Sequence, residues 1–263
     1  MFYNNNNNNN NNNTIVSIEG NIGSGKSTLL EKLKLHFNDK PNIIFLKEPV
    51  DDWSTIRDIN NKTMLELFYE DQNKYAFAFQ MMAYISRLAI LKEALQNNSN
   101  CIIITERSLY TDKMVFAKML FDNNNISLEN YSIYMKWFDT FVDCFKIDKI
   151  VYVKTDPEIC YNRIKTRSRT GESNIELDYL QKCHLYHENM LDISLDSCVC
   201  KNKFIVNGNI DIYYNINQVT EWIHDIEAFI YNKNTDYISP IDTNIITIEN
   251  NNINKNIQEF IYY

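Results

Sequence analysis

A glycine-rich turn near the N-terminus, GNIGSGKST at Gly20–Thr28, has the residue types and spacing to hold phosphate groups. It fits the pattern G-x-x-x-x-G-K-[ST], with a β-branched run before it and an apolar-periodic stretch after it. Lys26 supplies charge for the outer phosphates and Ser27 a hydroxyl ligand for Mg²⁺, at a helix N-terminus that favours anions. A glycine turn that matches by chance is the alternative, which these flanks disfavour. The predicted nucleotide contacts of this turn are Gly20, Asn21, Ile22, Gly23, Ser24, Gly25, Lys26, Ser27 and Thr28.

Two other expected strands also end in charged residues. Glu48 follows an apolar run and precedes Pro49, which stiffens the turn, so Glu48 can act as a general base toward a nearby hydroxyl. Glu106 and Arg107 follow a second run, where Glu106 can hold Mg²⁺ and Arg107 can clamp Glu48 and the acceptor oxygen. The alternatives are a solvated carboxylate at Glu48 and a structural Glu–Arg pair at 106–107.

Further candidates are polar or basic side chains on expected helices. Arg163, Arg167 and Arg169 lie where a helix should give way to a loop, so they can close over a triphosphate. A solvated basic face is the alternative. Gln80 and Arg87 are seven residues apart on one helix face, where Gln80 can read the edge of a nucleobase. Aromatic residues in the same region are more often core than ligand contacts.

The elements that position these residues alternate between strand and helix. Strands are expected at 14–18, 42–47, 101–105, 149–154 and 203–206. Helices are expected at 26–37, 55–70, 74–95, from 157 onward, at 178–195 and 213–232, with one or two more over 111–146 around the polar break 122–125. The alternation predicts an α/β P-loop kinase fold, a five-stranded, mostly parallel sheet flanked by helices and carrying an arginine-bearing lid. Ligands bind beyond the carboxyl ends of such strands, so the glycine turn, Glu48 and Glu106 should converge in one cleft.

Composition limits the class of protein. The chain has 263 residues and a formal net charge of −8, which argues against nucleic-acid or membrane-surface partners. We expect a disordered poly-Asn segment at 1–13, one domain at 14–232 and an Asn/Ile-rich tail at 233–263. The six cysteines show no zinc-like spacing with the four histidines and indicate reduced thiols. With no signal peptide or membrane span expected, a cytoplasmic location is predicted.

The motifs GNIGSGKST, KEPVDDW, FAFQMMAYISRL, ERSLYTDKMVFAKMLF and CYNRIKTRSRTGESNIELDYL, in this order, resemble the deoxynucleoside kinase family. The resemblance covers about Thr14 to Val206 and implies ATP and Mg²⁺ as cofactors, a deoxynucleoside as substrate and a homodimer. It implies Glu48 as the base that accepts the 5′-hydroxyl proton, Arg107 beside it and Lys26 on the phosphates, with Ser27 and Glu106 at the metal. The other implied nucleoside contacts are Trp53, Tyr69, Phe79, Gln80, Arg87, Asp112, Phe116 and Glu172. The implied ATP contacts beyond the glycine turn are Arg163, Arg167, Arg169, Gly208, Asn209 and Ile210.

The pair Arg87 and Asp112 resembles the deoxycytidine/deoxyguanosine branch of the family. An Asp-held Arg can donate to a base carbonyl, and Ala83 leaves room for a purine, so a deoxypurine is expected, deoxyguanosine slightly ahead of deoxyadenosine. Deoxycytidine kinase is the alternative, and a nucleoside monophosphate kinase or a non-catalytic nucleotide-binding protein are rival classes. Two departures from the family stand at Gly171 and at Val206–Ile210, where an acidic pair is replaced near the expected adenine site.

Overall fold

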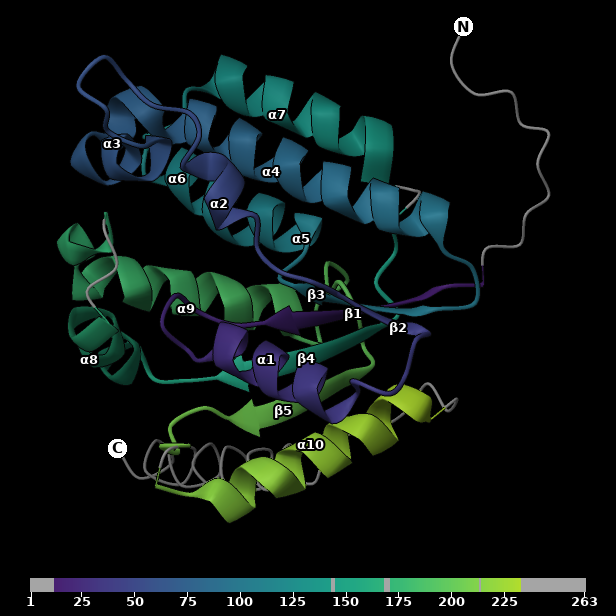
Figure 1. Cartoon of the computed structure of the whole chain (residues 1–263). Coiled ribbons are helices and arrows are strands. Elements are labelled where there is room, and N and C mark those ends of the chain that lie inside the picture. Colours follow the sequence, from purple (N-terminus) through teal and green to yellow (C-terminus); the bar gives the residue numbers. More distant parts are fainter. Residues whose placement is uncertain (1–11, 143–144, 168–170, 213, 233–263) are drawn as a thin grey trace, which may run out of the picture.

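Five parallel strands form the centre of the computed structural model, which describes residues 12–142, 145–167, 171–212 and 214–232 (Figure 1). The strands are β1 (Thr14–Glu19), β2 (Ile43–Leu46), β3 (Ile102–Glu106), β4 (Lys149–Lys154) and β5 (Lys203–Asn207), in the order β2-β3-β1-β4-β5. Every pairing is parallel, with β1 between β3 and β4. The predicted α/β fold with a five-stranded sheet is confirmed, and the sheet is entirely rather than mostly parallel.

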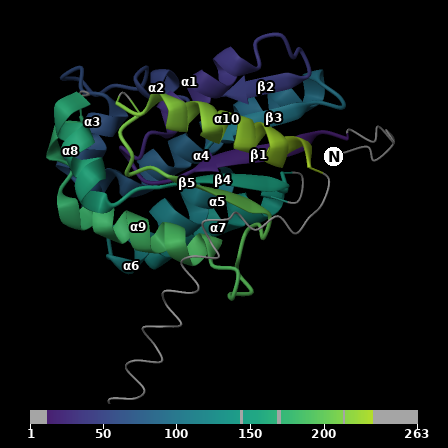
Figure 2. The same cartoon turned by 90° about the horizontal axis from the view of Figure 1, so that it is seen from below.

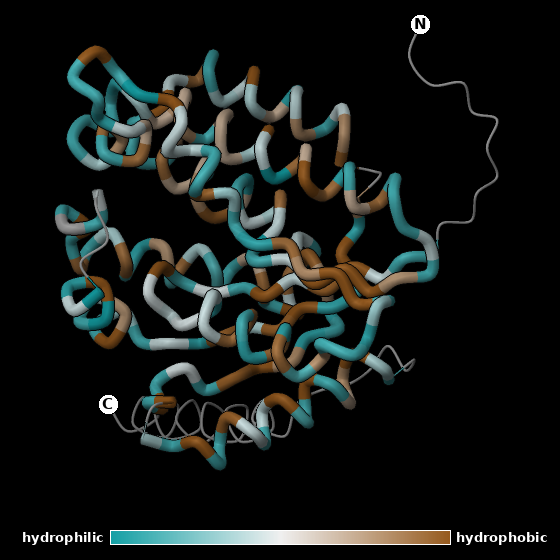
Figure 3. Tube along the Cα trace, viewed as in Figure 1, coloured by the Kyte–Doolittle hydropathy of each residue, from teal (hydrophilic) through white to brown (hydrophobic). Residues whose placement is uncertain are grey.

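Helices cover both faces of this sheet. Alternate residues of β1 point to opposite sides, so Val16 and Ile18 pack against α1 (Lys26–His36) and α10 (Ile216–Tyr231), which lie across one face in Figures 1 and 2. Ile15 packs on the other side with α4 (Gln72–Asn97) and α7 (Leu128–Phe141). The helices α8 (Pro157–Arg167) and α9 (Leu177–Leu191) pack with β4 and β5 through a third cluster. The hydropathy colouring of Figure 3 shows the apolar strands at the centre of these layers.

The helix expected over 55–70 is wrong in its first part. Helix α2 (Val50–Trp53) ends early, and α3 (Met64–Glu70) begins only after Thr63. The hydroxyl of Thr63 accepts from the backbone of Glu66, whose carboxylate accepts from the backbone of Thr63, and such a capping box fixes a helix start by about 1 kcal/mol. Between the helices, Asp58 binds the backbone N–H groups of a turn and Asn61 has a φ of 65°.

The region 111–146 holds two helical runs on either side of the predicted polar break. The first comprises α5 (Leu109–Thr111), the π-helical segment η1 (Asp112–Ala117) and α6 (Lys118–Asp122), and the second is α7. The π-helical turn has no local sequence signal and was not expected. The helix predicted over 178–195 ends at Leu191, because the Asp192 carboxylate binds the backbone and hydroxyl of Ser194 in a turn.

Five cysteines in the described part of the chain are free thiols, and Cys160, Cys183 and Cys200 among them are buried. The sixth, Cys144, lies outside the described residues, as do 1–11 and 233–263. No helix within the described ranges is both long enough and apolar enough to cross a bilayer.

Candidate active site

A cavity of about 770 Å³ lies beyond the carboxyl ends of the strands and gathers most of the predicted site residues. Its lining includes Ile22, Gly23, Ser24, Gly25, Lys26, Ser27, Thr28, Glu48, Trp53, Tyr69, Phe79, Gln80, Glu106, Arg107, Asp112, Phe116, Arg163, Arg167, Glu172, Gly208, Asn209 and Ile210. Three predicted contacts lie behind this lining, namely Gly20, Asn21 and Arg87, and Arg169 lies outside the described residues. The convergence of three strand ends in one cleft is therefore observed.

The phosphate-loop backbone has a shape that side chains would obstruct. Gly23 and Gly25 have φ angles of 78° and 105°, in the left-handed region that glycine adopts without strain. A Cβ on Gly23 would stand 2.7 Å from the backbone oxygen of Cys160 in α8. Lys26, which opens α1, is buried, and its Nζ donates to the backbone oxygen of Asn21 at 2.6 Å. Burial, and after it the positive charge of Arg107, lowers the pKa of Lys26 from 10.5 to about 7.

Two oxygen ligands suited to Mg²⁺ lie together at the base of α1. The Ser27 hydroxyl donates to Glu106 Oε1 at 2.5 Å, and Glu106 ends β3 one strand away from the phosphate loop. Hydroxyl and carboxylate oxygens are the donors that Mg²⁺ prefers when it also binds phosphate. These residues fit the metal that the sequence predicts.

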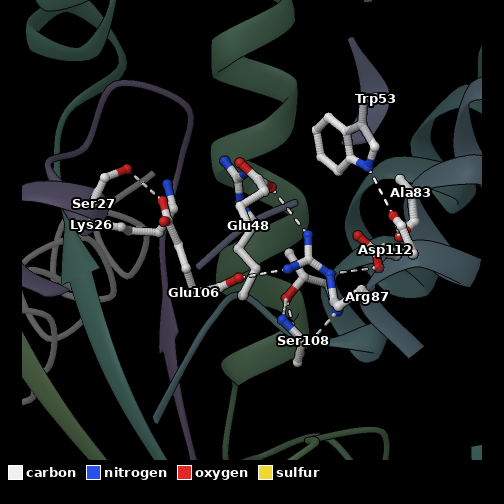
Figure 4. Close-up of polar contacts among 12 residues, drawn as sticks. Lys26, Ser27, Glu48, Trp53, Ala83, Arg87, Glu106, Ser108 and Asp112 are labelled. Atoms are coloured by element: carbon white, nitrogen blue, oxygen red, sulfur yellow. Dashed lines mark hydrogen bonds and ion pairs between the residues drawn. The ribbon is translucent and has the colours of Figure 1, made fainter. Parts of the chain in front are cut away.

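Glu48 lies at the centre of a buried charge cluster (Figure 4). Its Oε1 accepts from Arg107 at 2.6 Å and from Arg87 at 3.1 Å. Although burial alone would raise it, the pKa of Glu48 is held to about 2 by Arg107, Arg87 and Lys26. Both arginines contact Oε1, so Oε2 is the oxygen of this ionised carboxylate that can accept a proton from a ligand.

Arg87 is bound on all three of its nitrogen atoms. Nε donates to Asp112 at 2.9 Å, one terminal nitrogen donates to the backbone oxygen of Glu106 at 2.6 Å, and the other contacts Glu48. It lines a smaller cavity together with Glu106 and Arg107. Arg87 thus braces Asp112 and Glu48. The pairing of Arg87 with Asp112 that the sequence predicted is observed, and the contact of Arg87 with a base carbonyl stays a prediction.

An aromatic slot lies on the α2–α4 side of the cavity. Phe79 stacks on Phe68 with ring centroids 4.6 Å apart and meets the edge of Trp53 at 5.4 Å. The indole nitrogen of Trp53 donates to the Ser86 hydroxyl, which fixes the ring. Within this part of the structure, the buried Oε1 of Gln80 has no hydrogen-bond partner, so it is available to a ligand.

The opposite wall places Arg107 over Phe116, with the guanidinium 5.1 Å from the ring centroid. Arg107 has a φ of 62°, and its backbone N–H donates to Ile18 at 3.0 Å. A non-glycine residue in this conformation is uncommon and marks a turn held by its surroundings.

The predicted sugar contacts Tyr69 and Glu172 line the same cavity. Burial raises the pKa of Tyr69, so its phenol stays protonated and can donate a hydrogen bond. Arg167 forms an ion pair with Glu172, which is itself buried. Arg163 donates to the backbone oxygens of Ser24 and Ile210, and thereby joins the phosphate loop to the turn after β5.

Sequence reasoning missed two aromatic residues of the cavity lining and one buried carboxylate beneath it. Tyr179 of α9 lines the cavity and meets Tyr69 edge-on at 6.2 Å, and Trp222 of α10 lines the same cavity. Glu19, the last residue of β1, is fully buried and accepts from the Thr111 hydroxyl at 2.5 Å, while Thr111 exchanges hydrogen bonds with Ser108 in the turn after Arg107. A charged residue directly before the glycine turn was the available signal for Glu19.

Comparison with known proteins agrees with this geometry. A family model described as deoxynucleoside kinase matches residues 16–251. The chain is 34% identical over 218 residues to a probable deoxycytidine kinase of fowlpox virus, covering 82% of this chain and 87% of the relative. It is 33% identical over 196 residues to the deoxycytidine kinase of Bos taurus, covering 67% of this chain and 74% of the relative. It is 31% identical over 194 residues to the mitochondrial deoxyguanosine kinase of Xenopus laevis, covering 67% of this chain and 72% of the relative.

Proposed function

The chain belongs to the deoxynucleoside kinase family and is an enzyme that phosphorylates deoxynucleosides; from this premise we propose that it transfers the γ-phosphoryl group of ATP to the 5′-hydroxyl. The observation that carries the proposal is the placement of ionised Glu48 in the same cavity as the phosphate loop. The direct test is a coupled assay for ADP together with detection of the 5′-monophosphate.

In this reaction each charged residue has a separate task. The phosphate loop and Lys26 bind the triphosphate, and Lys26 takes up a proton there because anionic oxygens replace the backbone carbonyl it now contacts. Mg²⁺ held by Ser27 and Glu106 would supply positive charge on the transferring phosphates. Glu48 Oε2 accepts the proton of the 5′-hydroxyl, while Arg107 fixes the carboxylate and Arg163 and Arg167 face the triphosphate from α8.

For the base, we propose a deoxypurine, deoxyguanosine slightly ahead of deoxyadenosine. Ala83 lines the cavity together with Gln80, and its small side chain leaves room for a purine. The unpartnered Gln80 oxygen accepts from a base N–H. Deoxycytidine is the second candidate, because relatives in fowlpox virus and Bos taurus are named deoxycytidine kinases. Values of kcat/KM measured for the four deoxynucleosides decide between a deoxypurine and deoxycytidine. A preference for thymidine contradicts both assignments.

Two rival classes have direct tests. A nucleoside monophosphate kinase must bind an acceptor that is already anionic, and the ionised Glu48 is a poor neighbour for a phosphate. Comparing dGMP with deoxyguanosine as acceptor separates the two activities. A non-catalytic nucleotide-binding protein, the other class, does not agree with membership of a kinase family, and it would keep its function after the change Glu48→Gln.

We further propose a homodimer formed through α4 and α7. Both helices expose apolar side chains, among them Ile85 at 47%, Ile133 at 47% and Trp137 at 45%. Sedimentation equilibrium of the wild type against an Ile133→Asp, Trp137→Asp double variant tests this, and a monomeric wild type contradicts it.

We also propose a cytoplasmic location. It fits the free thiols of the described chain and is tested by cell fractionation.

A further inference from the structure

A group of metal-ligating side chains lies on the face of the molecule where α1 meets α10. His36, the last residue of α1, contacts Glu227 of α10 through Nε2 and Oε2 at 2.7 Å. The rings of His36 and His224 are perpendicular, with centroids 5.5 Å apart. One donor atom from each of the three residues lies within 4.8 Å of the other two.

We propose that His36, His224 and Glu227 form a binding site for a divalent transition metal ion of the zinc class. Two imidazole nitrogens and one carboxylate oxygen are a ligand set that Zn²⁺ uses, whereas Mg²⁺ prefers oxygen alone. The site is therefore chemically distinct from the pair Ser27 and Glu106.

The spacing of the ligands is close to what such an ion needs. Bonds of about 2.0–2.2 Å in tetrahedral geometry place ligand atoms about 3.4 Å apart. The 2.7 Å contact and the 4.8 Å limit lie on either side of this value, so small side-chain rotations suffice. His224 and Glu227 are three residues apart on one helix face, and the His224 side chain is exposed.

A simple hydrogen-bonded pair explains part of this arrangement. The contact between the His36 ring and the Glu227 carboxylate accounts for the placement of these two residues. It does not account for the placement of His224, whose ring lies against His36 on the same exposed face. The third ligand is what distinguishes a metal site from a pair.

The site is remote from the phosphate loop. His36 follows Lys26 by ten residues of one helix, which is about 15 Å along the helix axis. Both helices nevertheless line the nucleotide cavity with residues nearer their N-termini. These residues are Lys26 and Ser27 in α1 and Val219 and Trp222 in α10. A bound ion would link the two helices and so stabilise the wall of the nucleotide cavity.

The test uses full-length protein stripped with EDTA, then saturated with Mg²⁺ and titrated with Co²⁺ or Zn²⁺. Binding is followed by calorimetry, by Co²⁺ absorption and by thermal melting, and it does not depend on kinase activity. Thiolate ligation would add strong near-ultraviolet bands, so Co²⁺ spectra distinguish this site from the free cysteines. His36→Gln and His224→Gln are compared with His184→Gln, because His184 faces Glu188 at 4.0 Å in an otherwise similar His–Glu pair.

We expect one ion per chain in the wild type and in His184→Gln, with Tm raised by about 5 °C at a metal concentration 100 times Kd. Affinity should fall at least about tenfold in His36→Gln and in His224→Gln. Since His224 is exposed, its variant keeps the fold and decides the matter even if His36→Gln is destabilised. Unchanged binding in His224→Gln, thiolate bands, or no binding to the wild type would overturn the proposal.

Discussion

Replacing Glu48 with Gln removes the proposed base while keeping its shape. The amide oxygen can still accept from Arg107 and Arg87, which now contact Oε1 at 2.6 and 3.1 Å, but Oε2 becomes an NH₂ group that cannot take a proton. General bases contribute roughly 10²–10⁴ in rate. A carboxylate with a pKa of about 2 is a weak base, and phosphoryl transfer has a loose transition state, so we expect the lower end of this range. The kcat of Glu48→Gln should fall roughly 10²–10³-fold, equivalent to about 3–4 kcal/mol.

The same substitution has a second, separable effect on stability. In the wild type the pKa of Glu48 is lowered from 4.5 to about 2, so its ion pairs stabilise the folded state above pH 4.5. That contribution, on the order of 3 kcal/mol, is lost as the pH falls from 4.5 toward 2. Urea unfolding between pH 7 and pH 3 should therefore show a smaller pH dependence in Glu48→Gln than in the wild type.

The assay measures ADP formation at saturating ATP and deoxynucleoside, on protein shown to be folded by circular dichroism. Glu70→Gln is the matched control, because Glu70 has an equivalent ion pair with Lys62 at 2.6 Å on the surface, outside the cavity lining. It should leave kcat unchanged. A folded Glu48→Gln enzyme that keeps most of the wild-type kcat would refute the assignment of Glu48 as base.

Three further predictions concern neighbouring residues. The pKa of Lys26 is about 7 in the free enzyme, so ATP binding should take up a proton and weaken as the pH rises above 7, which calorimetry in buffers of different ionisation enthalpy detects. Gly23→Ala should abolish ATP binding, measured by fluorescence titration, because its Cβ would meet a backbone oxygen of α8 at 2.7 Å where φ is 78°. Thr111→Val should lower the free energy of unfolding by about 1–3 kcal/mol in urea titrations, because the buried Glu19 loses a donor, whereas Thr140→Val on the exposed face of α7 should change it little.

Local sequence signals were sufficient wherever one segment determines its own structure. The phosphate loop needs a strand, three glycines and a helix start in one stretch, and the carboxyl ends of parallel strands meet at one edge, so Glu48 and Glu106 could be placed beside it. The helix start at Thr63 was missed although its partner Glu66 follows at the spacing of a capping box. That error came from extending apolar periodicity across a turn.

Other features depend on contacts between distant segments and leave no local pattern. Arg87 was predicted beside Asp112, but its contacts with Glu48 and with the backbone of Glu106 were not predicted, because these partners come from the turn after β2 and from β3. The π-helical segment that carries Asp112 is set by packing of the same kind. Pairings of this type cannot be read from spacing along one helix.

The buried cluster also explains how a weak base can be accurately placed. Asp112 binds one side of Arg87 and Glu48 binds another, while Arg107, which follows the neighbouring strand β3, fixes the same Glu48 oxygen. Paired in this way, the carboxylate stays ionised inside the protein, where an unpaired charge would be strongly disfavoured. The pKa of Glu48 is thus low because the same arginines that fix its carboxylate also stabilise its charge. The reaction is accelerated by the position of this carboxylate more than by its basicity. A loose phosphoryl-transfer transition state requires the acceptor oxygen to be aligned more than it requires its proton to be removed early.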